Sequence, residues 1–166
     1  MRVERTAKGL TIEADDEAET VALGRALAEV VRPGTVIGLV GPLGAGKTRL
    51  VRALAEALGA DPAAIASPTF VLIHEYEARL PIYHFDAYRL DGPEDFDALG
   101  AGEYLGGDGL CLVEWADLVA DRLPASAWWT RIDAPSPTCR RFQTEVPDAV
   151  AGRLTELLAG LSRGVS

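Results

Sequence analysis

A glycine-rich turn joins an apolar run to an amphipathic segment in residues 35–58, which read TVIGLVGPLGAGKTRLVRALAEAL. Gly41, four further residues, and then Gly46, Lys47 and Thr48 match the phosphate-binding pattern G-x-x-x-x-G-K-[ST]. Glycines let backbone N–H groups turn inward around a polyphosphate, and the following helix adds its positive end. In this pattern the lysine reaches the outer phosphates and the threonine hydroxyl holds Mg²⁺. The segment therefore predicts a strand–loop–helix unit that binds a nucleotide.

The flanking residues have the periodicities that such a unit requires. Apolar residues at 36, 37, 39 and 40 indicate a buried strand, and those at 50, 51, 54 and 58 mark one face of a helix that stops at Gly59. Lys47 is also one of only two lysines among 16 basic residues. A compact ammonium thus stands at the position where phosphate binding requires one.

Length and composition favour a single domain spanning residues 1–166. The chain is about one domain long, and 48% of its residues are hydrophobic, which suffices for a sizeable core. We find no leader segment at the N-terminus and no apolar run approaching about 18 residues, so we expect a cytoplasmic protein without a membrane span.

The net charge of −9 is concentrated in the middle of the chain. Residues 75–117 hold eleven acids and only two arginines, Arg79 and Arg89, so the remainder sums to zero. Such a surface repels a phosphate backbone. We therefore expect contact with nucleic acid only where a partner supplies positive charge.

The other periodicities predict alternating helices and strands. A helix capped at Asp16 is expected to end before Pro33, and further helices are predicted over 93–99, 115–123 and 149–161, with a glycine-rich loop over 100–109. Predicted strands cover 10–13, 70–73, 82–86, 110–113, 128–132 and 140–146, of which 70–73 and 82–86 form a hairpin and 110–113 lies beside 36–40. This order favours a three-layer α/β P-loop NTPase fold, with a mixed, mostly parallel central sheet and antiparallel additions.

Two carboxylates close predicted strands where a nucleotide site needs an acid to hold the Mg²⁺ shell or to position water. Glu114 ends the run LCLVE, and Asp86 ends IYHFD. Both fall at strand ends, where sheets of this kind carry their sites, although each is also compatible with an ordinary strand-end carboxylate. The segment SPTF, 67–70, has the position of a γ-phosphate sensor or of a simple turn into a strand.

Other residues restrict the chemistry. The chain contains no asparagine, so it has no Asn-Lys-x-Asp guanine reader, which favours ATP. His74 and His84 lie ten residues apart without a third ligand nearby, and we interpret them as structural or surface residues rather than metal ligands. Cys111 lies in an apolar run and is expected to be a buried thiol.

The motifs GPLGAGKT, SPTF, YHFDAYRL and LVEWAD, in this order and spacing, resemble the TsaE family of small bacterial ATPases of tRNA threonylcarbamoyladenosine biosynthesis. The resemblance covers about residues 18–123. It implies catalytic roles for Lys47 and Asp86, with Thr48 and Glu114 holding Mg²⁺. The nucleotide-binding residues that it implies are Gly41, Leu43, Gly44, Ala45, Gly46, Lys47, Thr48, Arg49, Thr69 in the switch loop, Trp115 and, as a weaker match near the base, Thr20.

The resemblance also implies a function. The chain would hydrolyse ATP to ADP and phosphate, slowly alone and faster with its partners TsaD and TsaB, to reset the complex that transfers the threonylcarbamoyl group. It would meet tRNA only through that complex. Tyr88 and Arg89, in the same block as Asp86, are expected to face the partner. Two alternatives remain: a nucleotide-gated interaction module without essential hydrolysis, and a small-molecule kinase, which the scarcity of arginine in the acidic middle disfavours.

Overall fold

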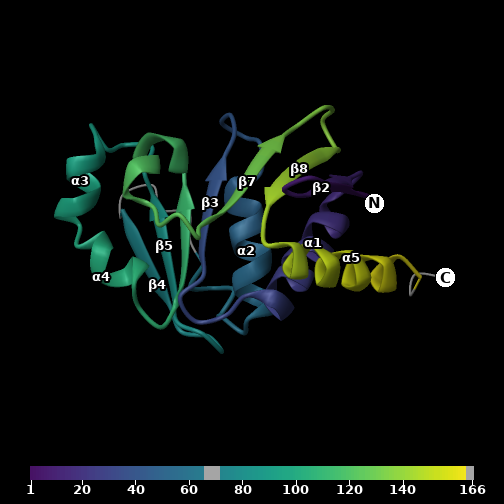
Figure 1. Ribbon diagram of the computed structural model, residues 1–166, viewed down its shortest axis with the longest axis horizontal. Helices are drawn as coiled ribbons and strands as arrows, with labels where there is room; N and C mark the ends of the chain where they lie inside the picture. Colours follow the sequence, from purple (N-terminus) through teal and green to yellow (C-terminus); the bar gives the residue numbers. More distant parts are fainter. Residues whose placement is uncertain (66–71, 164–166) are drawn as a thin grey trace.

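The computed structural model describes residues 1–65 and 72–163, which form an eight-stranded sheet with helices on both faces (Figure 1). The strands are β1 (Arg2–Thr6), β2 (Gly9–Ala14), β3 (Val36–Val40), β4 (Ile73–Tyr76), β5 (Ile82–Asp86), β6 (Leu110–Glu114), β7 (Trp128–Asp133) and β8 (Arg140–Glu145). The helices are α1 (Glu17–Val30), α2 (Lys47–Ala57), α3 (Pro93–Ala98), α4 (Ala101–Leu105), the 3₁₀ helix η1 (Ala116–Arg122) and α5 (Asp148–Arg163). Among these helices, none is both long and apolar enough to cross a membrane.

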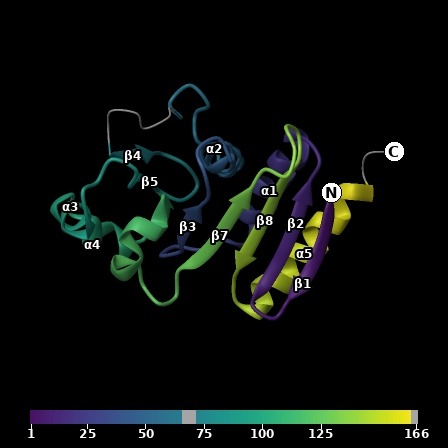
Figure 2. The same cartoon turned by 90° about the horizontal axis from the view of Figure 1, so that it is seen from above.

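Parallel strands occupy the centre of the sheet. The strand order is β1-β2-β8-β7-β3-β6-β5-β4, in which β7, β3, β6 and β5 pair in parallel while antiparallel strands extend both sides (Figure 2). The predicted mixed sheet, the hairpin of β4 and β5, and the place of β6 beside β3 are confirmed. Because β3, β5 and β6 run the same way, their carboxyl ends meet: Glu114 pairs with Leu39 on one side and with Asp86 on the other.

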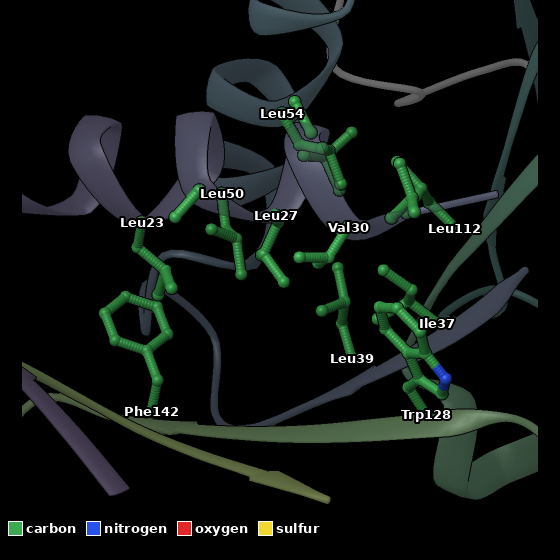
Figure 3. Packing of buried hydrophobic residues seen from close by; sticks show 14 of the residues in the cluster. Leu23, Leu27, Val30, Ile37, Leu39, Leu50, Leu54, Leu112, Trp128 and Phe142 are labelled. Carbon is green, nitrogen blue, oxygen red and sulfur yellow. The ribbon is translucent and has the colours of Figure 1, made fainter. Parts of the chain in front are cut away.

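Alternate residues of the central strands face two separate cores. Ile37 and Leu39 of β3 pack with apolar residues of α1, α2 and α5, and Figure 3 shows the leucines of α1 and α2 lying over this strand. Val36 and Val40 pack on the opposite face with residues of α3, α4 and η1. A strand buried on both sides reads as a continuous apolar run for this reason. The predicted three-layer arrangement is confirmed.

Several predicted elements need correction. The sequence did not indicate β1, whose residues are nearly all exposed at the sheet edge, so that no alternation marks them. Helix α4 occupies part of the predicted loop 100–109, because Gly100 adopts a left-handed conformation (φ 74°) that ends one helix and starts the next. The helix predicted over 115–123 is the 3₁₀ helix η1. The strand predicted over 70–73 is described from Ile73 onward in β4; residues 70 and 71 lie outside the described part.

Helices α1 and α2 make a close contact at Gly24. A Cβ atom at this position would lie 2.6 Å from the Cβ of Ala53 and 2.9 Å from the backbone nitrogen of Leu54. The side chain of Asp16 accepts a hydrogen bond from the backbone of Glu19 (2.8 Å), which confirms the predicted cap of α1.

We expect Gly24→Ala to destabilise the fold, although alanine favours a helix by about 1 kcal/mol over glycine. The added methyl group would overlap backbone atoms of α2, and overpacking of this kind costs about 1–3 kcal/mol. Urea unfolding measures the change. Gly160→Ala in α5 is the matched control, because nothing lies within 4 Å of a Cβ atom there and it should be neutral or slightly stabilising. A Gly24→Ala protein as stable as the wild type would contradict the contact.

Candidate functional site

The loop after β3 requires glycine at both of its ends. Gly41 has φ 153°, and a Cβ atom there would lie 2.2 Å from the carbonyl oxygen of Ile132. Gly46 has φ 108° and begins α2 without a side-chain cap. The first N–H groups of α2 therefore have no capping side chain and stand next to the loop, where the positive end of the helix favours an anion.

Lys47 is folded back onto this loop. Its ammonium donates to the carbonyl oxygens of Gly41 (2.7 Å) and Pro42 (3.0 Å) and lies 3.8 Å from the centroid of the Trp115 ring. Trp115 itself adopts a left-handed conformation (φ 57°), and its ring packs at a tilt of 38° against that of Tyr88, with 4.7 Å between centroids. A non-glycine residue in this conformation is strained, and such strain persists where the surroundings hold it.

Glu114 is almost completely buried, at 3% exposure, yet both of its carboxylate oxygens have donors. Oε2 accepts from the Thr48 hydroxyl (3.0 Å), and Oε1 lies 2.9 Å from His84 Nε2. His84 is fully buried, and its Nδ1 lies 3.2 Å from the Tyr76 hydroxyl. We interpreted His84 from the sequence as structural or at the surface; the structure places it directly behind the predicted Mg²⁺ acid. The available signal was its position two residues before Asp86, on the same face of β5.

Asp86 lies beside Glu114 at the end of the next strand. Its Oδ1 accepts from the backbone N–H of Tyr88 (3.0 Å). Burial raises the pKa of Asp86, a rise that the Tyr88 hydrogen bond opposes and the charge of Glu114 reinforces. Burial also lowers the pKa of Lys47, while Glu114 and Asp86 act in the opposite direction. A carboxyl and a lysine with displaced pKa values, here Asp86 and Lys47, are typical of functional sites when they share one sheet edge.

These side chains line a cleft of about 390 Å³. Its lining residues are Leu43, Gly44, Gly46, Lys47, Thr48, Arg49, Asp86, Tyr88, Arg89, Glu114 and Trp115. A neighbouring pocket of about 430 Å³ shares the loop and is lined by Asp16, Glu17, Thr20, Gly44, Gly46, Arg49, Pro137, Thr138 and Arg140. Sequence reasoning missed the β7–β8 turn as part of this pocket. Larger hollows of about 670 and 620 Å³, on the sheet face around Trp129 and between α1 and α5, contain none of the predicted site residues.

The structure therefore gathers most of the predicted residues around one loop. Thr20 lines the neighbouring pocket rather than the cleft that contains Asp86. Gly41 and Ala45 line neither hollow: the carbonyl of Gly41 holds Lys47, and Ala45 is buried beneath the loop. Thr69, with the rest of the SPTF segment, lies outside the described residues.

The family model described as "Threonylcarbamoyl adenosine biosynthesis protein TsaE" matches residues 14–142. The chain belongs to the TsaE family. Two relatives are named tRNA threonylcarbamoyladenosine biosynthesis protein TsaE. The one from Bacillus subtilis is 45% identical over 107 residues, which span 64% of this chain and 66% of the relative. The one from Haemophilus influenzae is 35% identical over 132 residues, 76% of this chain and 83% of the relative.

A solved structure agrees with the family assignment over almost the whole chain. The crystal structure of YdiB from Bacillus subtilis superposes with a TM-score of 0.70 at 34% sequence identity, covering 98% of this chain and 100% of YdiB. This TsaE chain thus has the mixed α/β P-loop NTPase fold that its sequence predicted.

The pKa of Asp86 leads to a pH-dependent stability prediction. Since burial raises the pKa above its unfolded value, the ionised carboxylate destabilises the fold, and this penalty develops as pH rises from the unfolded pKa through the folded one. Asp86→Asn should therefore raise the midpoint of thermal unfolding at pH 7. At pH 3, where the carboxyl is largely protonated in both states, the gain should disappear. A gain of equal size at both pH values would show that the carboxylate charge is not its cause.

Proposed function

We propose that this chain is an ATP-binding and ATP-hydrolysing component of tRNA threonylcarbamoyladenosine biosynthesis. The observation that carries the proposal is the meeting of Lys47 and Thr48, from the phosphate-binding loop, with Asp86 and Glu114 in one cleft. The loop offers backbone N–H groups and an ammonium to the phosphates. The two acids add a ligand for Mg²⁺ and an acceptor for the attacking water, both of which hydrolysis requires. Membership of the TsaE family and the names of its relatives support the pathway.

The donor set fits Mg²⁺. The Thr48 hydroxyl and the Glu114 carboxylate are hard oxygen ligands 3.0 Å apart, and Mg²⁺ is usually held by one or two such groups together with phosphates and water. When bound, the cation would neutralise charge on the phosphates. Because the hydroxyl donates its proton to Glu114, lone pairs of its oxygen remain for the cation.

The remaining roles in the proposed reaction fall to Lys47 and Asp86. Lys47 would exchange the carbonyl oxygens of Gly41 and Pro42 for phosphate oxygens, at little electrostatic loss, since both partners accept hydrogen bonds. Asp86 has its Oδ1 fixed by Tyr88, and its Oδ2 has no partner among the residues that the structure describes. In our proposal, this second oxygen would accept a hydrogen bond from the water that attacks the γ-phosphorus. The bond from that phosphorus to the β–γ bridging oxygen then breaks, giving ADP, phosphate and a proton.

The neighbouring pocket is our proposed site for the nucleoside. Thr20 and the turn residues Pro137 and Thr138 enclose it on the other side of the loop. Arg49 lies in the wall shared by both hollows. Its Nη2 pairs with Glu17 (2.7 Å), but its buried Nε has no partner within the described part of the chain. A buried donor of this kind needs an acceptor, which a nucleotide oxygen would supply.

The partner surface is proposed at the mouth of the cleft. Leu43 is 81% exposed, Tyr88 54% and Leu118 45%, although all three are large apolar or aromatic residues. Exposed apolar groups close to one another typically mark an interaction site. We propose that TsaD and TsaB cover this surface and stimulate hydrolysis, that tRNA is met only through them, and that the protein acts in the cytoplasm.

Single substitutions test the proposed reaction. Phosphate release should be slow without partners, and Lys47→Ala, Asp86→Ala and Glu114→Ala should each reduce the TsaD- and TsaB-stimulated rate by about a hundredfold or more, the usual loss when one charge-stabilising group is removed. Glu145→Gln, an acid on the antiparallel side, is the control and should leave the rate unchanged. Full stimulated hydrolysis by Asp86→Ala would refute the role given to that residue.

The exposed residues at the cleft mouth also favour a second candidate, a nucleotide-gated interaction module in which hydrolysis is incidental. The same variants separate the two. A module of this kind would sustain tRNA modification at full yield over repeated cycles with Asp86→Ala, whereas an ATPase that resets its complex would stop after the first cycle.

Leu118→Ser tests the partner surface without touching the cleft. Leu118 lies one turn of η1 from Trp115 and lines no part of the nucleotide site. We expect unchanged basal hydrolysis and a several-fold higher partner concentration for half-maximal stimulation, measured by titrating TsaD and TsaB. Glu156→Gln on α5 is the distant control. Unaltered stimulation by Leu118→Ser would place the interface elsewhere.

A further inference from the structure

Three side chains form a diagonal line across neighbouring strands beneath the cleft. His84 pairs directly with His74 of β4 and with Leu112 of β6, so Tyr76 and Glu114 are its diagonal neighbours on the two sides. Diagonal neighbours on one face of a sheet lie within reach of long and aromatic side chains. Their exposures are 4% for Tyr76, 0% for His84 and 3% for Glu114.

Hydrogen bonds connect this line to the phosphate-binding loop. Tyr76 Oη lies 3.2 Å from His84 Nδ1, His84 Nε2 lies 2.9 Å from Glu114 Oε1, and the Thr48 hydroxyl donates to Glu114 Oε2 at 3.0 Å. Neither Tyr76 nor His84 lines the cleft. Glu114 is thus contacted by Thr48 of α2 on the side of the cleft and by His84 of β5 on the side of the interior.

The direction of these bonds follows from the chemistry of the groups. A carboxylate oxygen accepts hydrogen bonds, so the tautomer that fits this contact has Nε2 donating to Glu114 Oε1. Burial raises the pKa of Tyr76 to about 12, which keeps its phenol protonated and able to donate to Nδ1. The phenol thereby fixes the imidazole with its Nε2 proton towards the carboxylate. The same arrangement is common where a second residue orients the ligand of a metal.

We propose that Tyr76 and His84 are positioning residues that hold the Glu114 carboxylate against Thr48 before a cation arrives, an inference that rests on the proposed function. A carboxylate at 3% exposure is tolerated only when donors compensate for the lost water. With His84 removed, Oε1 loses its donor, and the carboxylate must turn towards solvent to find another. A cation that binds must then bring the Glu114 carboxylate back to the Thr48 hydroxyl, so the affinity of the site for the cation falls.

Calorimetry on the full chain tests the positioning role directly. The measured quantity is a ratio: the affinity for ATP at saturating Mg²⁺ divided by the affinity for ATP in EDTA. His84→Leu should lower that ratio about tenfold or more, the usual effect of losing a group that orients a metal ligand, and leave the affinity in EDTA unchanged. His84→Gln should recover most of the ratio, because its amide can donate to Glu114. Tyr76→Phe should cause a smaller loss, since the ring remains but its orientation is freer.

Two further variants separate positioning from general destabilisation. Phe85→Leu alters the same strand on its opposite face, where Phe85 packs on Phe96, and it should leave the ratio unchanged. In a Glu114→Gln background, His84→Leu should produce no additional loss, because the residue through which it acts has already been altered.

The outcomes distinguish the inference from the function on which it rests. A wild-type ratio of one would refute the proposed Mg²⁺–nucleotide site itself. A wild-type ratio above one that His84→Leu and Tyr76→Phe leave unchanged would overturn the positioning role alone. An equal loss in Phe85→Leu, or additive losses in the double variant, would also overturn it. Tyr76→Phe keeps the test decisive if His84→Leu does not fold.

Discussion

The buried carboxylate of Glu114, at the end of central strand β6, is hydrogen-bonded to both α2 and β5. The Glu114 side chain is 3% exposed, and a carboxyl buried to this extent is tolerated because hydrogen-bonding groups from two other elements reach its oxygens. One donor comes from the first turn of α2 and the other from β5. The carboxylate therefore requires β6 to lie between β3 and β5, in the parallel register that the structure has.

The two halves of the sheet contribute differently to the candidate site. The parallel half is covered on both faces, Asp86 and Glu114 end two of its strands, and Lys47 begins the helix that follows a third. In the antiparallel part beyond β7, the buried apolar residues of β2 and β8 belong to the core that contains α1 and α5. Its contribution to the site is the β7–β8 turn, which reaches the second pocket through Pro137, Thr138 and Arg140.

Several features that lower the stability of the free protein lie at the same edge of the sheet. Trp115 has a strained backbone, burial lowers the pKa of Lys47, and burial raises the pKa of Asp86. Each costs stability in the free protein, and each involves a residue that lines the cleft where we propose the nucleotide binds. Strain and displaced pKa values are commonly stored where a ligand acts, since the surrounding fold holds them in place. The apolar core beneath, to which α1 and α2 contribute the largest shares, packs against this part of the fold.

Local spacing and periodicity were enough to predict the phosphate-binding loop, the strand and helix around it, and Asp86 and Glu114 as strand-end acids. They did not reveal β1, whose exposed edge lacks alternation, or helix α4, which forms within a glycine-rich stretch. Only the tertiary structure brought His84 to Glu114, thirty residues away, and the β7–β8 turn to the second pocket. Contacts of this kind depend on strand order and register, which long-range packing sets and no local pattern records.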